Sequence, residues 1–258
     1  MHRDIAYANT DNPRQKLDLV LPKTREGDKL PVLVFIHGGA WRAGDKRGGI
    51  RQLMPHVRSG RYAGVTVGYR LSNEATWPAQ IHDCKAAIRW VRANAEEYGL
   101  DPEKIGVFGT SAGGHLVAML GTSGGVAKLE GDLGDHDGQS STVSCVGNFF
   151  GPSELLTMSD HPSKMDHDAP DSPESMLVGG PLQKTKEVAR SASPITHVDA
   201  GDPPMLHIHG TDDPLVPYAQ SVVFDRALRA AGCDSVLLTV KGGGHGGFNN
   251  PEVERQLK

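Results

Sequence analysis

The sequence of 258 residues contains little of what marks several classes of protein. It has only 3 cysteines and no Cys-x-x-Cys pair, which gives a zinc or redox site little support. The aromatic content is 5%, and the longest apolar runs, such as Val32–Ile36, are far shorter than the ~20 residues of a membrane span. Lys and Arg number 27 against 31 Asp and Glu, and this mildly acidic balance disfavours nucleic acid as the main partner.

The rest of the composition is globular, with 38% hydrophobic and 22% charged residues. Because single α/β domains often reach ~250 residues and no linker or repeat divides the chain, we expect one domain over residues 1–258. Met1–Ile5 lacks the apolar stretch of a signal peptide, so either a cytoplasmic protein or one with its signal removed is expected. Cys84, Cys145 and Cys233 lie in apolar-periodic segments and are expected to be small buried residues.

Short apolar runs bounded by Gly, Pro, Asp or Asn indicate strands covered on both faces. These runs are Val32–His37, Val65–Tyr69, Ile105–Phe108, Cys145–Phe150, Met205–His209 and Val236–Val240. Lys16–Leu21 alternates leucines with other residues, which predicts a half-exposed leading strand. Apolar residues recur at helical spacing in Ala79–Tyr98, between Pro78 and Gly99, and again in Tyr218–Ala231. Strands alternating with helices predict an α/β fold, with a mainly parallel sheet flanked by helices on both faces.

Two long polar segments, residues 121–144 and 155–188, interrupt this alternation. Loops of such length are usually functional or mobile. We expect both to overhang the C-terminal edge of the sheet, where α/β sheets bind ligands, and to form a small cap made of loops. Within the second segment, the Asp- and His-rich stretch 160–168 matches no metal-ligand spacing, so a solvated loop and no metal site are expected.

The segment Gly109–Gly114 carries the pattern G-x-S-x-G between a predicted strand and a helical pattern, the context that this motif requires. Its small residues allow a sharp turn from which the Ser111 hydroxyl projects. The N–H group of Ala112 then points from the start of the helix toward the place where an oxyanion would form. A plain Gly/Ser-rich connection is the alternative, and the flanking strand and helix make it the weaker one.

A serine hydroxyl becomes a good nucleophile only when a base takes its proton. Among the 12 histidines, His245 is the best candidate because it lies in a run of glycines directly after the last predicted strand. His115 follows the serine turn in the helical register and is interpreted as a packing residue. The acid that orients the base is expected just beyond a strand, between the serine and the histidine in sequence. Asp213 is our choice, and Asp212 stays the alternative because spacing cannot separate neighbours.

The strand that ends at Ile36 is followed by the small residues Gly38, Gly39 and Ala40. They let the N–H groups of Gly39 and Ala40 turn toward the same point as that of Ala112, and one such donor contributes ~3–4 kcal/mol in a transition state. The alternative is a tight turn without this role. A nucleotide-binding loop has less support, because neither G-x-x-x-x-G-K-[ST] nor a strand-linked G-x-G-x-x-G occurs.

Three aromatic residues follow strands at this edge or lie near it. Trp41, Tyr69 and Trp77 are expected to line an acyl or sugar pocket, since aromatic faces pack well against both groups. Ordinary packing is an equal alternative for Tyr69 and Trp77.

These motifs together resemble the carboxylesterases of the α/β-hydrolase superfamily. The stretches that carry the resemblance are His37–Trp41, Gly109–Gly114, His209–Pro217 and Gly244–Gly246. Within the superfamily the chain is most similar to the bacterial feruloyl and acetyl-xylan esterases and to the hormone-sensitive-lipase-like esterases. Stretches that fit the first group are Tyr69–Leu71, Trp77–Gln80, Phe150–Pro152, Ser172–Ser175 and Pro203–Met205. The resemblance covers nearly the whole chain and implies ester hydrolysis through an acyl-serine, without a cofactor.

Two departures from the family pattern are informative. Ala40 replaces the third glycine of the lipase-like HGGG pattern, which favours the carbohydrate-esterase branch. The resemblance also implies a final helix that usually continues beyond the position of Lys258.

The sequence therefore predicts a carboxylesterase with Ser111, Asp213 and His245 as its triad. The low aromatic content and the lack of a long apolar lid helix favour a small or polysaccharide-linked ester over a substrate at an oil interface. The resemblance implies an acetyl or feruloyl ester. A serine peptidase or lipase of the same fold is one alternative. A non-catalytic binding module on the same scaffold is another, since a fold does not fix a function.

Overall fold

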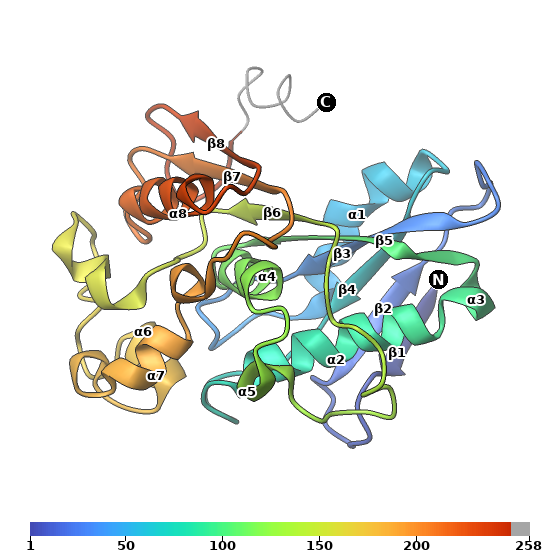
Figure 1. Ribbon diagram of the computed structural model, residues 1–258, viewed down its shortest axis with the longest axis horizontal. Coiled ribbons are helices and arrows are strands. Elements are labelled where there is room, and N and C mark those ends of the chain that lie inside the picture. The colour runs from blue at the N-terminus through green and yellow to red at the C-terminus, as the bar shows by residue number, and fades with distance from the viewer. Residues whose placement is uncertain (249–258) are drawn as a thin grey trace.

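The structure is a computed structural model that describes residues 1–248, and its centre is an eight-stranded sheet (Figure 1). In spatial order the strands are β1 (His2–Ala6), β2 (Lys16–Val20), β4 (Ala63–Val67), β3 (Leu30–Ile36), β5 (Leu100–Thr110), β6 (Cys145–Phe149), β7 (Met205–Gly210) and β8 (Ser235–Val240). β2 is antiparallel to both of its neighbours, and every pair from β4 to β8 is parallel. The predicted mainly parallel α/β sheet is confirmed.

The first edge of the sheet differs from the prediction. The polar strand β1, which the sequence pattern does not indicate, forms the exposed edge. β2 therefore lies inside the sheet and is buried rather than half-exposed. The carboxylate of Asp18 in β2 accepts a hydrogen bond of 2.6 Å from Lys46 Nζ. This ion pair explains how a charged residue can be buried in the strand.

Helices cover both faces of the sheet (Figure 1). Leu53 and Val57 of α1 (Gly49–Arg58), which follows η1 (Lys46–Gly48), pack on one face. The opposite face is covered by α2 (Ala79–Ala93), α4 (Ala112–Thr122) and α8 (Ala219–Ala230), whose buried residues share the main core. The predicted helix 79–98 is interrupted at Asn94, and its second part, α3 (Ala95–Tyr98), ends at the left-handed Gly99 as expected.

The first long segment does not overhang the C-terminal edge, which corrects the expectation for residues 121–144. Helix α4 runs back along the sheet from the end of β5. The chain therefore leaves α4 near the edge of the sheet where the parallel strands begin, which is also where β6 begins. The segment includes α5 (Ala127–Glu130) and packs on α2 (Figure 1). Lys85 Nζ donates to Glu130 Oε1 at 2.6 Å, and Arg92 Nη2 donates to the carbonyl of Thr142 at 2.9 Å.

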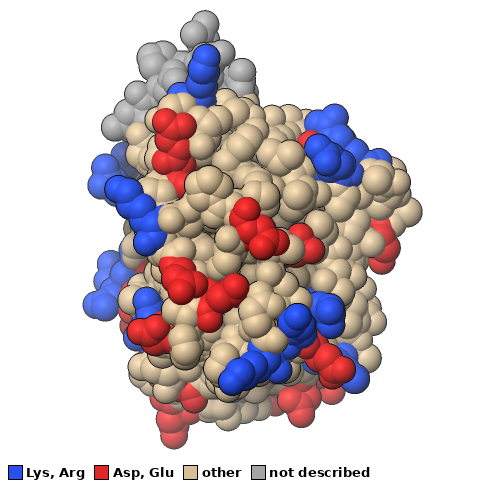
Figure 2. Space-filling view, turned by 90° about the vertical axis from the view of Figure 1, so that its left-hand side faces the viewer, with Lys and Arg blue, Asp and Glu red and all other residues tan. Residues whose placement is uncertain are grey.

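The second long segment does overhang the C-terminal edge, and short helices rather than loops alone build it. These are η2 (Leu155–Asp160), α6 (Pro173–Val178), η3 (Leu182–Lys184), α7 (Lys186–Ser191) and η4 (Pro194–His197). We call residues 155–197 the cap. It lies at the left of Figure 1, and the side of the molecule that carries it has acidic side chains near its centre and groups of both signs around them (Figure 2).

Three further expectations concern single features. Cys84 and Cys233 are buried as expected, but Cys145 is exposed, because it begins β6 and borders an open cavity of about 610 Å³ on the α1 face. Within residues 1–248 no helix is both long and apolar enough to span a membrane. The final helix implied by the resemblance would fall on residues 249–258, outside the described residues.

Candidate active site

Ser111 occupies a strained turn between β5 and α4. Its φ and ψ of 56° and −123° lie outside the regions that non-glycine residues usually adopt. The turn is held by a 2.9 Å hydrogen bond from the Ser111 N–H to the Phe149 carbonyl. Close backbone approach explains the two flanking glycines: a Cβ on Gly113 would lie 2.1 Å from the Ile36 oxygen, and one on Gly109 would lie 2.4 Å from the Gly113 oxygen. The predicted strand, turn and helix around the serine are present.

His245 and Asp213 meet at the C-terminal edge of the sheet. His245 Nδ1 lies 2.7 Å from Asp213 Oδ2, and the Asp213 side chain is buried. Asp212, the alternative acid, is exposed and accepts a hydrogen bond from Thr211. The structure therefore brings the preferred acid to the histidine and turns its neighbour to the surface.

The Asp213 carboxylate is held by more donors than the sequence reasoning identified. The N–H groups of Leu215 and Val216 donate to Oδ1 at 2.8 and 3.0 Å, and His209 Nε2 lies 3.1 Å from Oδ2. Burial opposes ionisation of the carboxyl, but these hydrogen bonds and the one from His245 outweigh it and hold the pKa of Asp213 well below its usual range. In the sequence His209 belongs to a motif without a role of its own, and its position four residues before the acid is the signal that could identify it.

Of the expected oxyanion donors, Ala40 and Ala112 line the same cavity as Ser111, and Gly39 directly precedes Ala40. Gly39 has φ of +115° and Ala40 has φ of 55°. A Cβ on Gly39 would lie 2.2 Å from the Ala43 oxygen, so this position requires glycine. Within residues 1–248, the N–H groups of Gly39, Ala40 and Ala112 make no hydrogen bond to the protein. They are thus available to an external acceptor.

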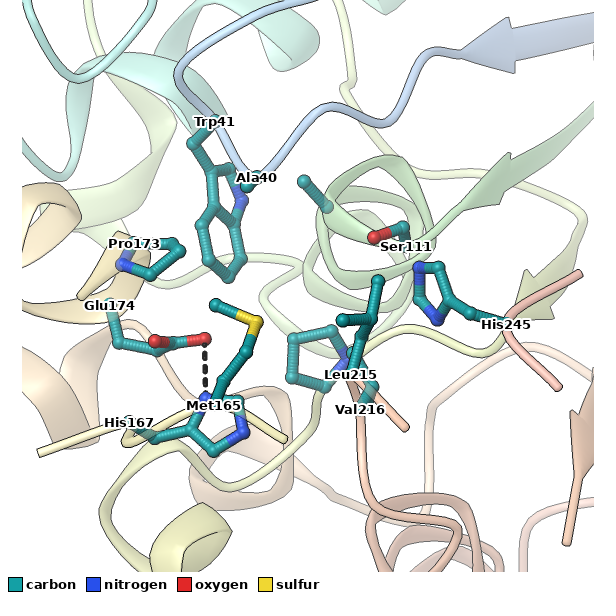
Figure 3. A pocket seen from close by; sticks show the side chains of 12 residues that line it. Ala40, Trp41, Ser111, Met165, His167, Pro173, Glu174, Leu215, Val216 and His245 are labelled. Atoms are coloured by element: carbon teal, nitrogen blue, oxygen red, sulfur yellow. Dashed lines mark ion pairs between the residues drawn. The ribbon is translucent and has the colours of Figure 1, made fainter. Parts of the chain in front are cut away.

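A small cavity of about 60 Å³ lies between this edge and the cap (Figure 3). It is lined by Ala40, Trp41, Ser111, Ala112, Pro152, Met165, His167, Pro173, Glu174, Leu215, Val216 and His245. Ser111 and His245 lie together at one end of it (Figure 3). Within the described residues the Ser111 hydroxyl has no hydrogen-bond partner; such contacts often tighten only when substrate binds.

Of the three aromatic residues expected in the pocket, only Trp41 lines it. Tyr69 is fully buried, stacks on His37 with ring centres 4.3 Å apart and donates to the His37 carbonyl at 2.9 Å. Trp77 donates its indole N–H to Ser191 Oγ at 3.2 Å. Packing, the stated alternative, therefore holds for Tyr69 and Trp77, because sequence position at the edge does not fix the direction of a ring.

The cap contributes a buried pair that sequence reasoning missed. His167 was expected in a solvated loop, yet it is 1% exposed, and its Nδ1 lies 3.2 Å from Oε1 of the equally buried Glu174. Glu174 belongs to the stretch Ser172–Ser175, which carried a resemblance but no assigned role. No group of three or more metal-ligating side chains occurs in the part of the chain that the structure describes.

His115 lies between Trp41 and the cap. Trp41 Nε1 donates to His115 Nδ1 at 3.2 Å, and His115 Nε2 lies 2.6 Å from the Ala192 carbonyl in the cap. Burial lowers the pKa of His115 from its ordinary value of 6.5 to about 4, although the contact with Ala192 acts in the opposite direction. The ring is therefore neutral near pH 7 and joins the cap to Trp41.

Comparisons with known proteins agree with this geometry. The BD-FAE family matches residues 17–228. Esterase LipC of Mycobacterium tuberculosis is 32% identical over 245 residues, which are 95% of this chain and 59% of LipC. The chain spans about half the length of the curated relatives it matches.

Two solved structures extend the comparison. A truncated carbohydrate esterase from gut microbiota superposes with a TM-score of 0.86 and 34% identity, covering 99% of this chain and 92% of that one. Est2 of the planctomycete Thermogutta terrifontis, an esterase with bound propionate, has a TM-score of 0.74 and 30% identity, covering 93% and 82%. Since the family match covers most of the sequence, the chain belongs to the BD-FAE family, among the carboxylesterases of the α/β-hydrolase superfamily.

Proposed function

We propose that this protein is a serine carboxylesterase that hydrolyses short-chain or carbohydrate-linked esters through an acyl-serine intermediate. Ser111 Oγ attacks the ester carbonyl while His245 takes its proton. His245 then delivers that proton to the leaving alcohol, and it later activates the water that releases the acid. Asp213 orients the imidazole and stabilises its charged form. The N–H groups of Gly39, Ala40 and Ala112 bind the oxyanion.

One observation carries this proposal above the others. Asp213 Oδ2 lies 2.7 Å from His245 Nδ1, and His245 lines the same cavity as Ser111. The Asp213 contact directs Nε2 of the same ring away from the acid, which is the orientation a base for Ser111 requires. Free N–H groups beside a strained serine support the same chemistry.

The size of the cavity supports a small acyl group. A cavity of about 60 Å³ is much smaller than the ~300–1,000 Å³ of most ligand pockets. The names of the similar structures, a carbohydrate esterase and an esterase with bound propionate, support a short acyl group and a carbohydrate alcohol.

Hydrolysis of p-nitrophenyl acetate by the wild type and by Ser111→Ala tests the proposal. We expect the variant to lose at least ~10³-fold in kcat, because the oxyanion donors alone leave only residual catalysis. The control is Ser59→Ala at the exposed end of α1, which should keep the wild-type rate.

Labelling with a fluorophosphonate, followed by mass spectrometry of the peptide that contains Ser111, separates an esterase from a binding module. We expect the adduct on Ser111 in the wild type and none in the variant. Full activity in Ser111→Ala, or a wild type that neither hydrolyses the ester nor takes the label, would refute the proposal.

A further inference from the structure

Glu174 presents an unusual carboxylate to the cavity. The residue is 3% exposed, and one of its oxygens, Oε1, lies 3.2 Å from His167 Nδ1. Its other oxygen, Oε2, is buried and has no hydrogen-bond partner within residues 1–248. Buried polar atoms of native proteins are nearly always hydrogen-bonded, so such an exception in a residue that lines the candidate active site needs an explanation.

The neighbouring histidine does not supply the missing donor in this arrangement. His167 Nε2 lies 3.2 Å from Ser163 Oγ, and that hydroxyl lies 3.2 Å from the carbonyls of Pro214 and Leu215. Since the hydroxyl donates to a carbonyl, its oxygen accepts from His167 Nε2. The other ring nitrogen, Nδ1, lies 3.2 Å from Oε1 without making a hydrogen bond, so Oε2 and Nδ1 are both buried without a partner within residues 1–248, and a hydroxyl of a bound molecule could pair with them.

The position of Glu174 indicates which part of an ester it would meet. Glu174 and His167 lie at the end of the cavity opposite Ser111 and His245 (Figure 3). Because His245 gives its proton to the leaving alcohol, the alcohol lies on the His245 side, and the acyl group extends away from it toward Met165 and Glu174.

We propose that Glu174 determines acyl specificity by accepting a hydrogen bond from a hydroxyl on the acyl group, so that the site favours esters of small hydroxy acids over unsubstituted acids of equal size. This inference rests on the proposed esterase function and deepens it. A site that holds a buried hydrogen-bonding group discriminates against an analogue of the same shape that lacks the matching group. We expect a preference of about 10- to 100-fold for a hydrogen bond to a charged acceptor.

Methyl glycolate and methyl propionate form a matched pair for the test, because they differ only by a hydroxyl in place of a methyl group. Acid release in a pH-stat gives kcat/KM for each ester, with the wild type, Glu174→Gln and Glu174→Leu. The hydroxyl also activates the ester chemically, so the informative quantity is the change in the glycolate-to-propionate ratio between enzymes.

We expect this ratio to fall about 10- to 100-fold in Glu174→Leu and by a smaller factor in Glu174→Gln, whose amide oxygen still accepts. Glu187→Gln, at an exposed position of the same cap, should keep the wild-type ratio. If the leucine variant does not fold, the glutamine variant of the same size carries the test.

Two results would overturn the proposal, and they are distinguishable. A wild type that hydrolyses p-nitrophenyl acetate and both methyl esters, with the same ratio in every variant, removes the role of Glu174 and leaves the esterase function intact. A wild type that hydrolyses none of the three esters refutes the esterase function, and the specificity with it.

Discussion

The two walls of the cavity are built in different ways. The sheet-edge wall, formed by Ala40, Ser111, Ala112 and His245, follows directly from the ends of strands. The cap wall is formed by Met165 and His167, in the segment between η2 and α6, and by Pro173 and Glu174 at the start of α6. Under the proposed function, the chemistry depends on the backbone and the catalytic side chains of the first wall, and the selectivity depends on the side chains of the second.

Local strain distinguishes the sheet-edge wall. Ala40 and Ser111 of this wall, and Trp41 next to Ala40, all have positive φ values near 55°. Such conformations cost ~1–3 kcal/mol each and persist only where surrounding contacts fix them. Substitutions here are expected to disturb the backbone geometry of the site, whereas substitutions in the cap wall mainly change the shape and polarity of the cavity.

The largest effect is expected from breaking the sheet-edge wall at Asp213. Asp213→Asn keeps the size of the side chain but cannot stabilise a protonated His245, so kcat for p-nitrophenyl acetate should fall ~10³–10⁴-fold. Asp212→Asn is the matched control, because Asp212 is exposed and should leave the rate near that of the wild type. Equal losses in the two variants, or a loss only in Asp212→Asn, would show that the triad has been assigned wrongly.

Much of the sheet-edge wall could be predicted from the sequence because its residues follow strands. The apolar runs indicate the strands, and the carboxyl ends of parallel strands meet at one edge of the sheet. Ser111, Asp213 and His245 are therefore expected at the same edge without any knowledge of side-chain contacts. The choice between Asp212 and Asp213 could not be made in this way, since adjacent residues share a position and only tertiary packing decides which of them is buried.

The cap wall and several packing details depend on contacts that the sequence does not encode locally. Glu174 and His167 meet across a loop. Glutamate and histidine in such a sequence are typical of a solvated surface, so their residue types do not predict this buried contact. The directions of Tyr69 and Trp77 depend on their partners in other segments. The position of residues 121–144 could have been derived, because a helix that starts at one edge of the sheet must end at the other.

An intermediate effect is expected from His115, which joins the two walls. Its pKa is about 4 in the folded chain, below its ordinary value of 6.5. Unfolded protein therefore binds the proton more readily as the pH falls from 6.5 toward 4, and the folded state loses stability over that window. This group alone should lower the free energy of unfolding by about 2 kcal/mol at pH 5 relative to pH 7.

Urea unfolding of the wild type and of His115→Gln at pH 7 and pH 5 measures this contribution to the free energy of unfolding. Since glutamine does not titrate, the variant should lose about 2 kcal/mol less between pH 7 and pH 5 than the wild type does. The comparison uses the difference between the two pH values, so it does not depend on how far the substitution itself destabilises the fold. An identical pH dependence in both proteins would contradict a buried, neutral His115.

The smallest effect is expected in the cap wall, at Met165. Met165→Ala removes a half-buried side chain that lines the acyl end of the cavity, so the site should accept longer acyl groups. Because one methylene in an apolar pocket changes specificity by about 10-fold or more, the ratio of kcat/KM for p-nitrophenyl butyrate over acetate should rise ~10-fold. Lys164→Ala, at the exposed neighbouring position, should leave that ratio unchanged.

The Met165 result decides whether the two walls are independent. If selectivity resides in the side chains of the cap, the ratio changes while kcat for the acetate, whose short acyl group needs little of this space, falls far less than in Asp213→Asn. If Met165→Ala instead lowers kcat for both esters to a similar extent without changing the ratio, the cap must help to hold Ser111 and His245 in place. The contact from His115 to Ala192 would then be the connection to examine, because it links the cap to the strained edge of the sheet.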